Sequence, residues 1–127
     1  AAFLGSPIIR VFCATVPEKN ADGNDPWPAM IAGYQEVADY AATKGIAVGL
    51  QNHPSTGEDV LRILDQTNRD NFTLIMDTGQ WVGSPALNNG VSDPEVDIYA
   101  FMEQTARHTA HVRAKFYKID TGKEAVR

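Results

Sequence analysis

Apolar residues along this chain gather in four short runs that alternate with segments of helical spacing. The third run, 72–76, is apolar at almost every position and ends in Asp77 and a glycine turn. This pattern is typical of a parallel strand that is buried on both faces. The other three runs are also rich in apolar residues and are bounded by turn formers or helix ends. We therefore predict strands at residues 8–14, 46–50, 72–76 and 110–119.

Three segments between these runs predict helices. The first spans residues 29–44, with Gly45 placed to end it in a left-handed conformation. The second follows Ser55 and Glu58, which have the spacing of a capping box. The third begins at Asp93, as an N-cap followed by proline at the first helical position. Its predicted inner stripe consists of Val96, Tyr99, Met102 and Ala106.

Strands that alternate with helices of this length predict βαβ units and a parallel sheet. The expected fold class is α/β, with about four parallel strands and three intervening helices. No internal boundary is evident, so we expect residues 1–127 to form a single domain. A sheet of four strands leaves both edges open. We therefore expect a piece of a larger barrel or sheet, truncated at both ends, that is not stable alone.

Composition narrows the classes of partner. The chain has a net charge of −5, which argues against nucleic acid or an anionic membrane, because those surfaces attract basic patches. No apolar run approaches the roughly 18 residues that suggest a spanning helix. The single cysteine, Cys13, lies in an apolar run and predicts a buried thiol in a reducing compartment. The expected location is cytoplasmic, and an oligomer is compatible with the sequence.

Polar residues occur at the ends of the predicted strands. Side-chain alternation puts Gln51, Asp77 and Arg113 on one face of three consecutive strands. Ligands of parallel α/β folds bind at the carboxyl ends of the strands. The sequence therefore predicts a site where these three side chains approach one another. In the fourth strand, the polar face consists of His111, Arg113, Lys115 and Tyr117.

Three motifs carry a resemblance to a known family. They are Gly-Leu-Gln-Asn-His at 49–53, Met-Asp-Thr-Gly-Gln-Trp at 76–81 and His-Val-Arg-Ala-Lys at 111–115. In this order they resemble the sugar phosphate isomerase/epimerase superfamily, the xylose isomerase-like TIM barrels, which also include endonuclease IV-type enzymes. The resemblance covers essentially the whole chain and implies a partial (β/α)8 barrel, from about strand four to strand seven.

The resemblance also implies a divalent metal (Mn, Mg, Co or Zn) held by a Glu, an Asp, a His and a final Glu on consecutive strands. Asp77 matches the Asp position, whereas Gln51 stands at the first Glu position and Arg113 at the His position. Gln51 could serve only as a weak neutral ligand, and Arg113 has no lone pair to give. The last position falls beyond Arg127. We therefore hypothesise that Arg113 replaces the cation and pairs with Asp77, bidentately if the geometry allows.

The leading functional hypothesis is a sugar or sugar-phosphate isomerase or epimerase of carbohydrate metabolism, acting by proton transfer next to a carbonyl. Under this hypothesis the full-length protein is an enzyme, and its partner is a small sugar or sugar phosphate. Arg113 and Lys115 would stabilise an oxyanion or hold a substrate carboxylate or phosphate, and His53, His111 or a glutamate on the next strand would be the base. The expected substrate-binding residues are Gln51, Asn52, Trp81 and Arg113.

Four of these residues also have a structural interpretation. Asn52 could shape the turn, His53 could make a structural hydrogen bond, and Trp81 could cover the core. His111 is expected to be a buried structural histidine. For the protein as a whole, one alternative is a non-catalytic carbohydrate-binding relative of the family. Another is an endonuclease IV-like, metal-dependent nuclease, which the acidic charge disfavours.

Overall fold

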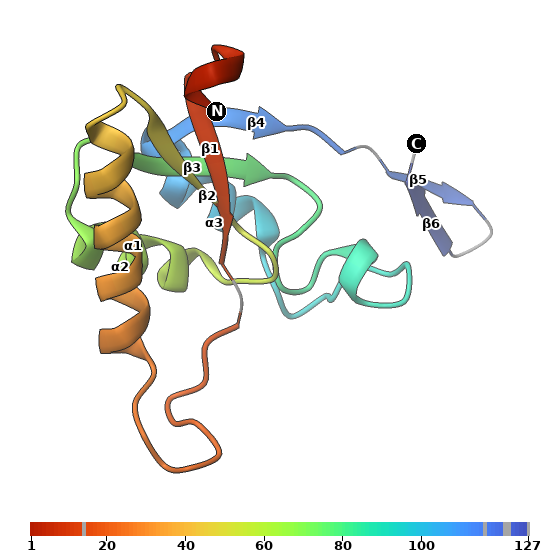
Figure 1. Ribbon diagram of the computed structural model, residues 1–127. Helices are drawn as coiled ribbons and strands as arrows, with labels where there is room; N and C mark the ends of the chain where they lie inside the picture. Colours follow the sequence, from red (N-terminus) through yellow and green to blue (C-terminus); the bar gives the residue numbers. More distant parts are fainter. Residues whose placement is uncertain (14, 116, 121–122, 127) are drawn as a thin grey trace.

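The computed structural model describes residues 1–13, 15–115, 117–120 and 123–126 (Figure 1). The strand β1 (Ile8–Phe12), the helix α1 (Trp27–Ala42) and the strand β2 (Ala47–Gln51) come first. They are followed by α2 (Gly57–Thr67), β3 (Phe72–Asp77), α3 (Ile98–Thr105) and β4 (Thr109–Arg113). Three 3-10 turns, η1 (Ala2–Leu4), η2 (Pro85–Leu87) and η3 (Ala106–His108), and two more strands, β5 (Tyr117–Asp120) and β6 (Lys123–Val126), complete the described chain.

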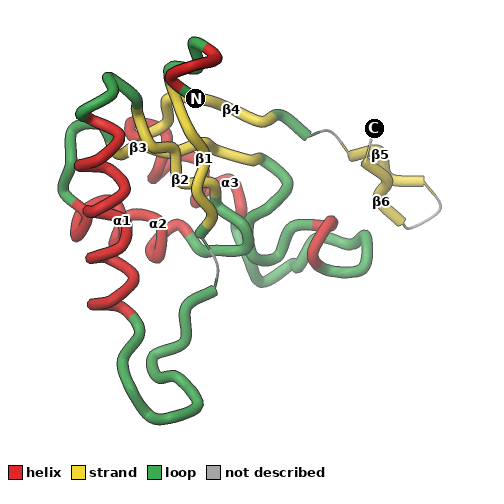
Figure 2. Tube along the Cα trace, in the orientation of Figure 1, coloured by secondary structure: helices red, strands yellow, loops and turns green. Residues whose placement is uncertain are grey.

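The main sheet contains four parallel strands in the order β1-β2-β3-β4. The predicted alternation of strands and helices, and hence the α/β fold class, is confirmed. The three helices lie on one face of this sheet, with α1 next to β2 and α2 between α1 and α3 (Figure 2). Within the described part of the chain, no helix is long and apolar enough to cross a lipid bilayer.

The hydrophobic core lies between the sheet and the helices. Alternate residues of β2 and β3 point into it, among them Val48, Leu50 and Leu74, which are fully buried. They meet buried residues of α2 such as Val60 and Ile63. Burying each of these side chains contributes about 1.5–3 kcal/mol. The predicted burial of Cys13 is also confirmed, and residue 14, the end of the first predicted strand, lies outside the described residues.

Helix α2 begins one residue later than the capping box predicts. Its N-cap is Thr56, whose hydroxyl accepts the amide of Asp59 at 3.1 Å. Ser55 instead forms a parallel bridge with Trp81, and its carbonyl accepts the amide of Val82. This backbone pairing fixes Ser55 against the loop after β3, and the helix begins at Gly57 with Thr56 as its cap. The predicted cap at Ser55 was wrong by one residue, since the capping-box spacing is a local signal and the pairing of Ser55 with Trp81 is not.

Helix α3 also begins later than predicted. Asp97 is its N-cap and accepts the amides of Tyr99 and Ala100, whereas Asp93 accepts the amide of Glu95 within the preceding turn. The predicted inner stripe is wrong at Tyr99, which is 76% exposed, and at exposed Ala106, and Val96 precedes the helix. The core contacts come from Ile98, Phe101 and Met102, because α2 and the loop after β3 determine which face of α3 is covered.

The predicted fourth strand is too long. β4 ends at Arg113, the partner of Asp77 at the last position of β3. The Thr78 side chain then bonds both the amide and the carbonyl of Lys115, and the chain leaves the sheet there because β3 offers no further partner. Residues 117–126 contain a separate antiparallel pair, β5 and β6. Residue 116 and the predicted break at residue 122 lie outside the described residues.

Alkaline pH is expected to destabilise the protein through Tyr34. Its hydroxyl donates to the carbonyl of Phe12 at 2.8 Å, and burial, assisted by the charge of Cys13, raises its pKa from 10.0 to about 12. The unfolded chain therefore loses its phenolic proton near pH 10 while the folded protein keeps it. This stabilisation is fully present below pH 10 and is lost as the pH rises towards 12.

The measurement is the free energy of unfolding of the full-length protein between pH 8 and 12. Tyr34→Phe should cost about 1 kcal/mol at neutral pH and show a smaller alkaline loss than the parent. Tyr40→Phe is the matched control, because Tyr40 is 69% exposed and makes no comparable buried bond among the described residues. An alkaline loss as large in Tyr34→Phe as in the parent would contradict the assignment.

Candidate functional site

Charged and amide side chains gather on the face of the main sheet that the helices leave open. They come from near the carboxyl ends of all four parallel strands. The register pairs Phe12 with Gln51, Gln51 with Ile75, and Asp77 with Arg113. Partners in a parallel sheet point to the same face, so Gln51, Asp77 and Arg113 share it, as the alternation of side chains predicts.

Asp77 is the centre of this cluster and is fully buried. Its Oδ2 accepts a hydrogen bond from Gln51 Nε2 at 3.0 Å, and its Oδ1 accepts the amide of Gly79 at 3.1 Å. Asn52 donates from Nδ2 to the Asp77 carbonyl at 2.9 Å and accepts the Asp77 amide at 2.8 Å. Asn52 is itself fully buried, so its described contacts position the backbone of Asp77.

Two cations from the end of β4 and the following turn meet the Asp77 carboxylate. Arg113 Nη1 lies 3.4 Å and Lys115 Nζ lies 3.3 Å from Asp77 Oδ2. Arg113 Nη1 also donates to Gln51 Oε1 at 3.2 Å. The pair between Asp77 and Arg113 is therefore present, made by one guanidinium nitrogen rather than two.

The structure adds Arg10, which the sequence pattern did not single out. Arg10 Nη1 donates to Gln51 Oε1 at 3.1 Å, so two guanidinium groups share one amide oxygen. The Arg10 guanidinium also lies 4.6 Å from the centre of the Phe12 ring, in a cation–π contact. A charge inside an apolar strand was the available signal, the same one that singled out Arg113.

The remaining predicted site residues fall in three environments. His53 is half-buried just after β2, and its ring lies 5.8 Å from the Phe12 ring in an edge-on contact. Trp81 is fully buried in the hydrophobic core, 5.7 Å from the Phe101 ring. Its expected role as a stacking surface is not supported, because its faces are covered by core residues. His111 is exposed, and its expected burial was wrong, because no described element covers the open face of the sheet.

The donors in the cluster do not suit a divalent metal. Asp77 is its single carboxylate, and no group of three or more histidine, cysteine, aspartate or glutamate side chains in the described ranges could hold an ion. Hard cations prefer several oxygen ligands. Here a guanidinium and an ammonium lie beside the carboxylate oxygen that a metal would use.

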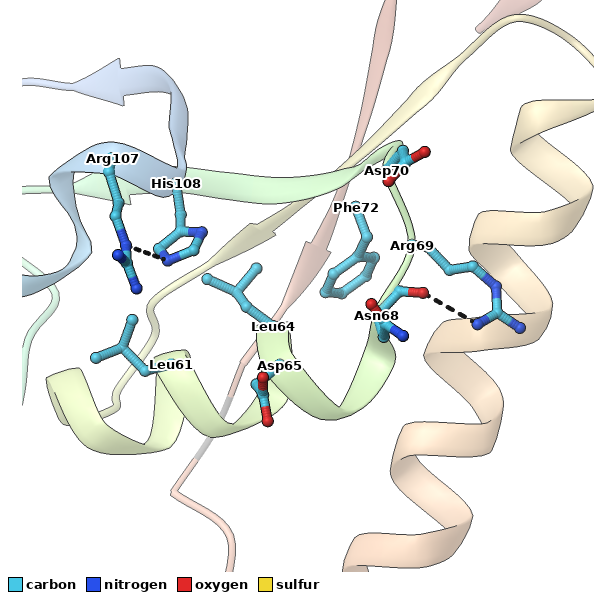
Figure 3. Close-up of a pocket in the computed structure, with 9 residues that line it drawn as sticks. All are labelled: Leu61, Leu64, Asp65, Asn68, Arg69, Asp70, Phe72, Arg107 and His108. Atoms are coloured by element: carbon cyan, nitrogen blue, oxygen red, sulfur yellow. Dashed lines mark hydrogen bonds between the residues drawn. The ribbon is translucent and has the colours of Figure 1, made fainter.

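A pocket at the opposite end of the sheet has a volume of about 460 Å³ (Figure 3). It lies beside the amino ends of β3 and β4. Its walls combine acids with Arg107, whose Nε donates to His108 Nε2 at 3.0 Å, over an apolar floor that includes Phe72. Ligand sites of parallel α/β folds lie at the carboxyl ends of the strands. The cluster around Asp77 is therefore the candidate site.

Gly49 lies on the open face of β2, two positions before Gln51. A Cβ at this position would lie 2.5 Å from two side-chain atoms of Ile75 and 3.0 Å from Ile8. Gly49→Ala is expected to lower the free energy of unfolding of the full-length protein by about 1–3 kcal/mol, because Ile75 must move. Chemical denaturation measures this, with Gly33→Ala as the control, since a Cβ there meets nothing within 4 Å and favours the helix. Equal stability of the two variants would contradict the prediction.

Comparisons with known proteins identify similar sequences and similar folds. A family model described as "Xylose isomerase-like TIM barrel" matches residues 1–125. The inosose dehydratase of Glaesserella parasuis serovar 5 (strain SH0165) is 29% identical over 106 residues, which cover 80% of this chain and 33% of that protein. The chain thus spans about a third of the length of this curated relative.

Two solved structures illustrate the likeness in fold. A xylose isomerase domain protein from Planctomyces limnophilus superposes with a TM-score of 0.73 at 16% identity, covering 98% of this chain and 44% of that one. A xylose isomerase-like TIM barrel protein from Mycobacterium smegmatis, in complex with magnesium, gives a TM-score of 0.67 at 20% identity, covering 96% and 44%. The described sheet and helices therefore form part of a TIM barrel, as the sequence predicts.

Proposed function

Because this chain belongs to the xylose isomerase-like TIM-barrel family, we propose that the full-length protein is a sugar or sugar-phosphate isomerase or epimerase with an altered metal site. The observation that carries the proposal is the contact of Arg113 and Lys115 with Asp77 at the carboxyl end of the sheet. In this proposal, these two side chains supply the positive charge that a divalent ion would otherwise supply.

The chemistry requires that charge. Removing a proton next to a carbonyl places negative charge on the carbonyl oxygen, and donors aimed at that oxygen lower the barrier. Arg113 keeps further N–H groups beyond the one that bonds Gln51, and its side chain is 42% exposed on the open face. Lys115 lies beside it and adds a second cation. Both groups are proposed to bind the developing oxyanion.

The base must be a group other than Asp77 or Gln51. Asp77 is fully buried against the groups that contact its carboxylate, which leaves it no exposed oxygen to receive a substrate proton, and a glutamine side chain cannot take up a proton. His53 is the first candidate, because it is half-buried and sits at the same end of the sheet. Exposed His111 is the second. Gln51 is proposed to orient Asp77 and Arg113 and to contact the substrate.

A turnover screen of the full-length protein tests the proposal. Ketoses, aldoses and their phosphates are incubated with the protein before and after exhaustive chelation, and with added Mn²⁺, while the metal content is measured. The expected result is interconversion of a sugar pair that chelation does not abolish. About one tightly held divalent ion per chain, lost together with activity and dependent on Asp77, would overturn the proposal.

A second candidate is dehydration of an inosose, which the name of the curated relative favours. The same screen distinguishes it, because loss of water changes the product mass by about 18 Da and interconversion leaves the mass unchanged. Saturable ligand binding without turnover of any substrate would instead favour a non-catalytic carbohydrate-binding protein.

A further inference from the structure

We propose that Arg10 and Arg113, joined by the Gln51 side-chain oxygen, form a receptor for an oxyanion group, so that the site takes a sugar acid or a sugar phosphate in preference to a neutral sugar. The inference rests on the proposed function, since it assigns a substrate class to the same site. It adds Arg10, a residue of β1, to the groups that contact the substrate.

The first support is the arrangement of the two guanidinium groups. Arg10 Nη1 and Arg113 Nη1 donate to the same Gln51 Oε1 at 3.1 Å and 3.2 Å. Two like charges held this close repel each other, and the neutral amide oxygen together with the Asp77 carboxylate, which Arg113 shares with Lys115, compensates them only in part. An anion between them would relieve the repulsion. Guanidinium forks match phosphate and carboxylate groups in geometry.

The second support is the charge balance of the cluster. Arg10, Arg113 and Lys115 contribute three positive charges and Asp77 contributes one negative charge, which leaves an excess of two positive charges. The chain as a whole has a net charge of −5. The excess is therefore local to this face. A local excess of positive charge at the end of a parallel sheet attracts an anionic ligand and directs it to one place.

The third support is the way Arg10 is held. Its guanidinium lies 4.6 Å from the Phe12 ring centre, and the Phe12 carbonyl is anchored by the Tyr34 hydroxyl at 2.8 Å. The Phe12 ring is 52% exposed on the same face. Phe12 thus limits the positions that Arg10 can take and leaves apolar surface beside it. A group held in place before the ligand arrives costs less to order on binding.

Equilibrium binding to the full-length protein tests the inference. Calorimetric titrations compare inorganic phosphate, D-glucose 6-phosphate, D-gluconate and D-glucose, first with the parent and then with Arg10→Gln. The expected result is tighter binding of the anions than of D-glucose, weakened by salt, and a loss of about tenfold or more in anion affinity for Arg10→Gln. The phosphate and gluconate arms identify which oxyanion is preferred.

Arg107→Gln is the control, because Arg107 lies at the opposite end of the sheet and contacts His108. It should bind anions as the parent does. Arg10→Lys keeps the charge without the fork and should bind with intermediate affinity. Circular dichroism checks the fold of each variant, and Arg10→Lys alone carries the test if Arg10→Gln fails to fold.

Equal binding of anions and D-glucose by the parent, or unchanged anion affinity in a folded Arg10 variant, would overturn the inference. These outcomes are distinct from failure of the proposed function. Turnover of a neutral sugar that is insensitive to Arg10→Gln would leave the proposed function standing and remove the receptor. Anion binding that depends on Arg10, without turnover of any substrate, would leave the receptor standing and count against the proposed function.

Discussion

Replacing Asp77 by alanine is expected to lower the free energy of unfolding of the full-length protein by about 3 kcal/mol and to weaken ligand binding at this site, because Gln51, Arg113 and Lys115 lose the carboxylate that positions them. Asp77 is fully buried and accepts hydrogen bonds from Gln51 and Gly79 while pairing with Arg113 and Lys115. Its removal leaves two cations without their carboxylate. This loss of stability is near the lower limit expected for breaking a buried ion pair, because the side chains of Arg113 and Lys115 are 42% and 23% exposed.

Asp77→Asn refines this prediction. The substitution keeps the shape but replaces one acceptor oxygen by a donor, so that it cannot satisfy the Gly79 amide and the Gln51 amide together. Gln51 could rotate its amide, but its oxygen would then leave Arg10 and Arg113. We expect Asp77→Asn to be less destabilising than Asp77→Ala and still defective in binding.

Urea unfolding followed by circular dichroism measures the effect of both Asp77 variants. Asp65→Ala is the control, because Asp65 is an exposed residue of α2 outside the cluster and should change the free energy of unfolding by less than about 0.5 kcal/mol. If Asp77→Ala also changes the free energy of unfolding by less than about 0.5 kcal/mol, the stability of the protein does not depend on the Asp77 carboxylate.

Arg113→Ala is expected to reduce ligand affinity about 10- to 100-fold while changing the free energy of unfolding by less than about 1 kcal/mol. The loss of affinity follows from removing a charged donor that faces the ligand. Stability changes little because the side chain is 42% exposed and Lys115 remains on Asp77. The two quantities separate a binding role from a structural one.

Titration with the sugars and sugar phosphates that bind the parent, together with thermal unfolding, measures this split. Arg113→Lys keeps the charge and should recover part of the affinity, since only the fork is lost. Arg107→Ala, at the other end of the sheet, should affect neither quantity. Unchanged affinity of Arg113→Ala for every such ligand would count against a role for Arg113 in binding.

Much of the fold could be predicted because the signals are local. The alternation of apolar runs with helical spacing is a property of neighbouring residues, and it yields four parallel strands and three helices in the right order. Helix starts were less predictable. The cap of α2 is Thr56 rather than Ser55, whose backbone pairs with the loop after β3, a segment more than twenty positions away.

The candidate site was predictable in part. The alternation of side chains along a strand is enough to predict that Gln51, Asp77 and Arg113 share one face. The same rule says nothing about which side chain is covered by a helix. Trp81, for which stacking on a substrate and covering the core were both expected, is fully buried, whereas Phe12 of the first predicted strand is 52% exposed.

By itself, the sequence determined the order of the elements, the α/β class and the arrival of Asp77 at the end of a buried strand. The tertiary structure decided what surrounds Asp77. Arg10 and Arg113 lie 41 and 62 positions from Gln51, and they reach its oxygen because the strands pair in one register. Contacts of this kind depend on the packing of distant segments, which no local pattern of residues encodes.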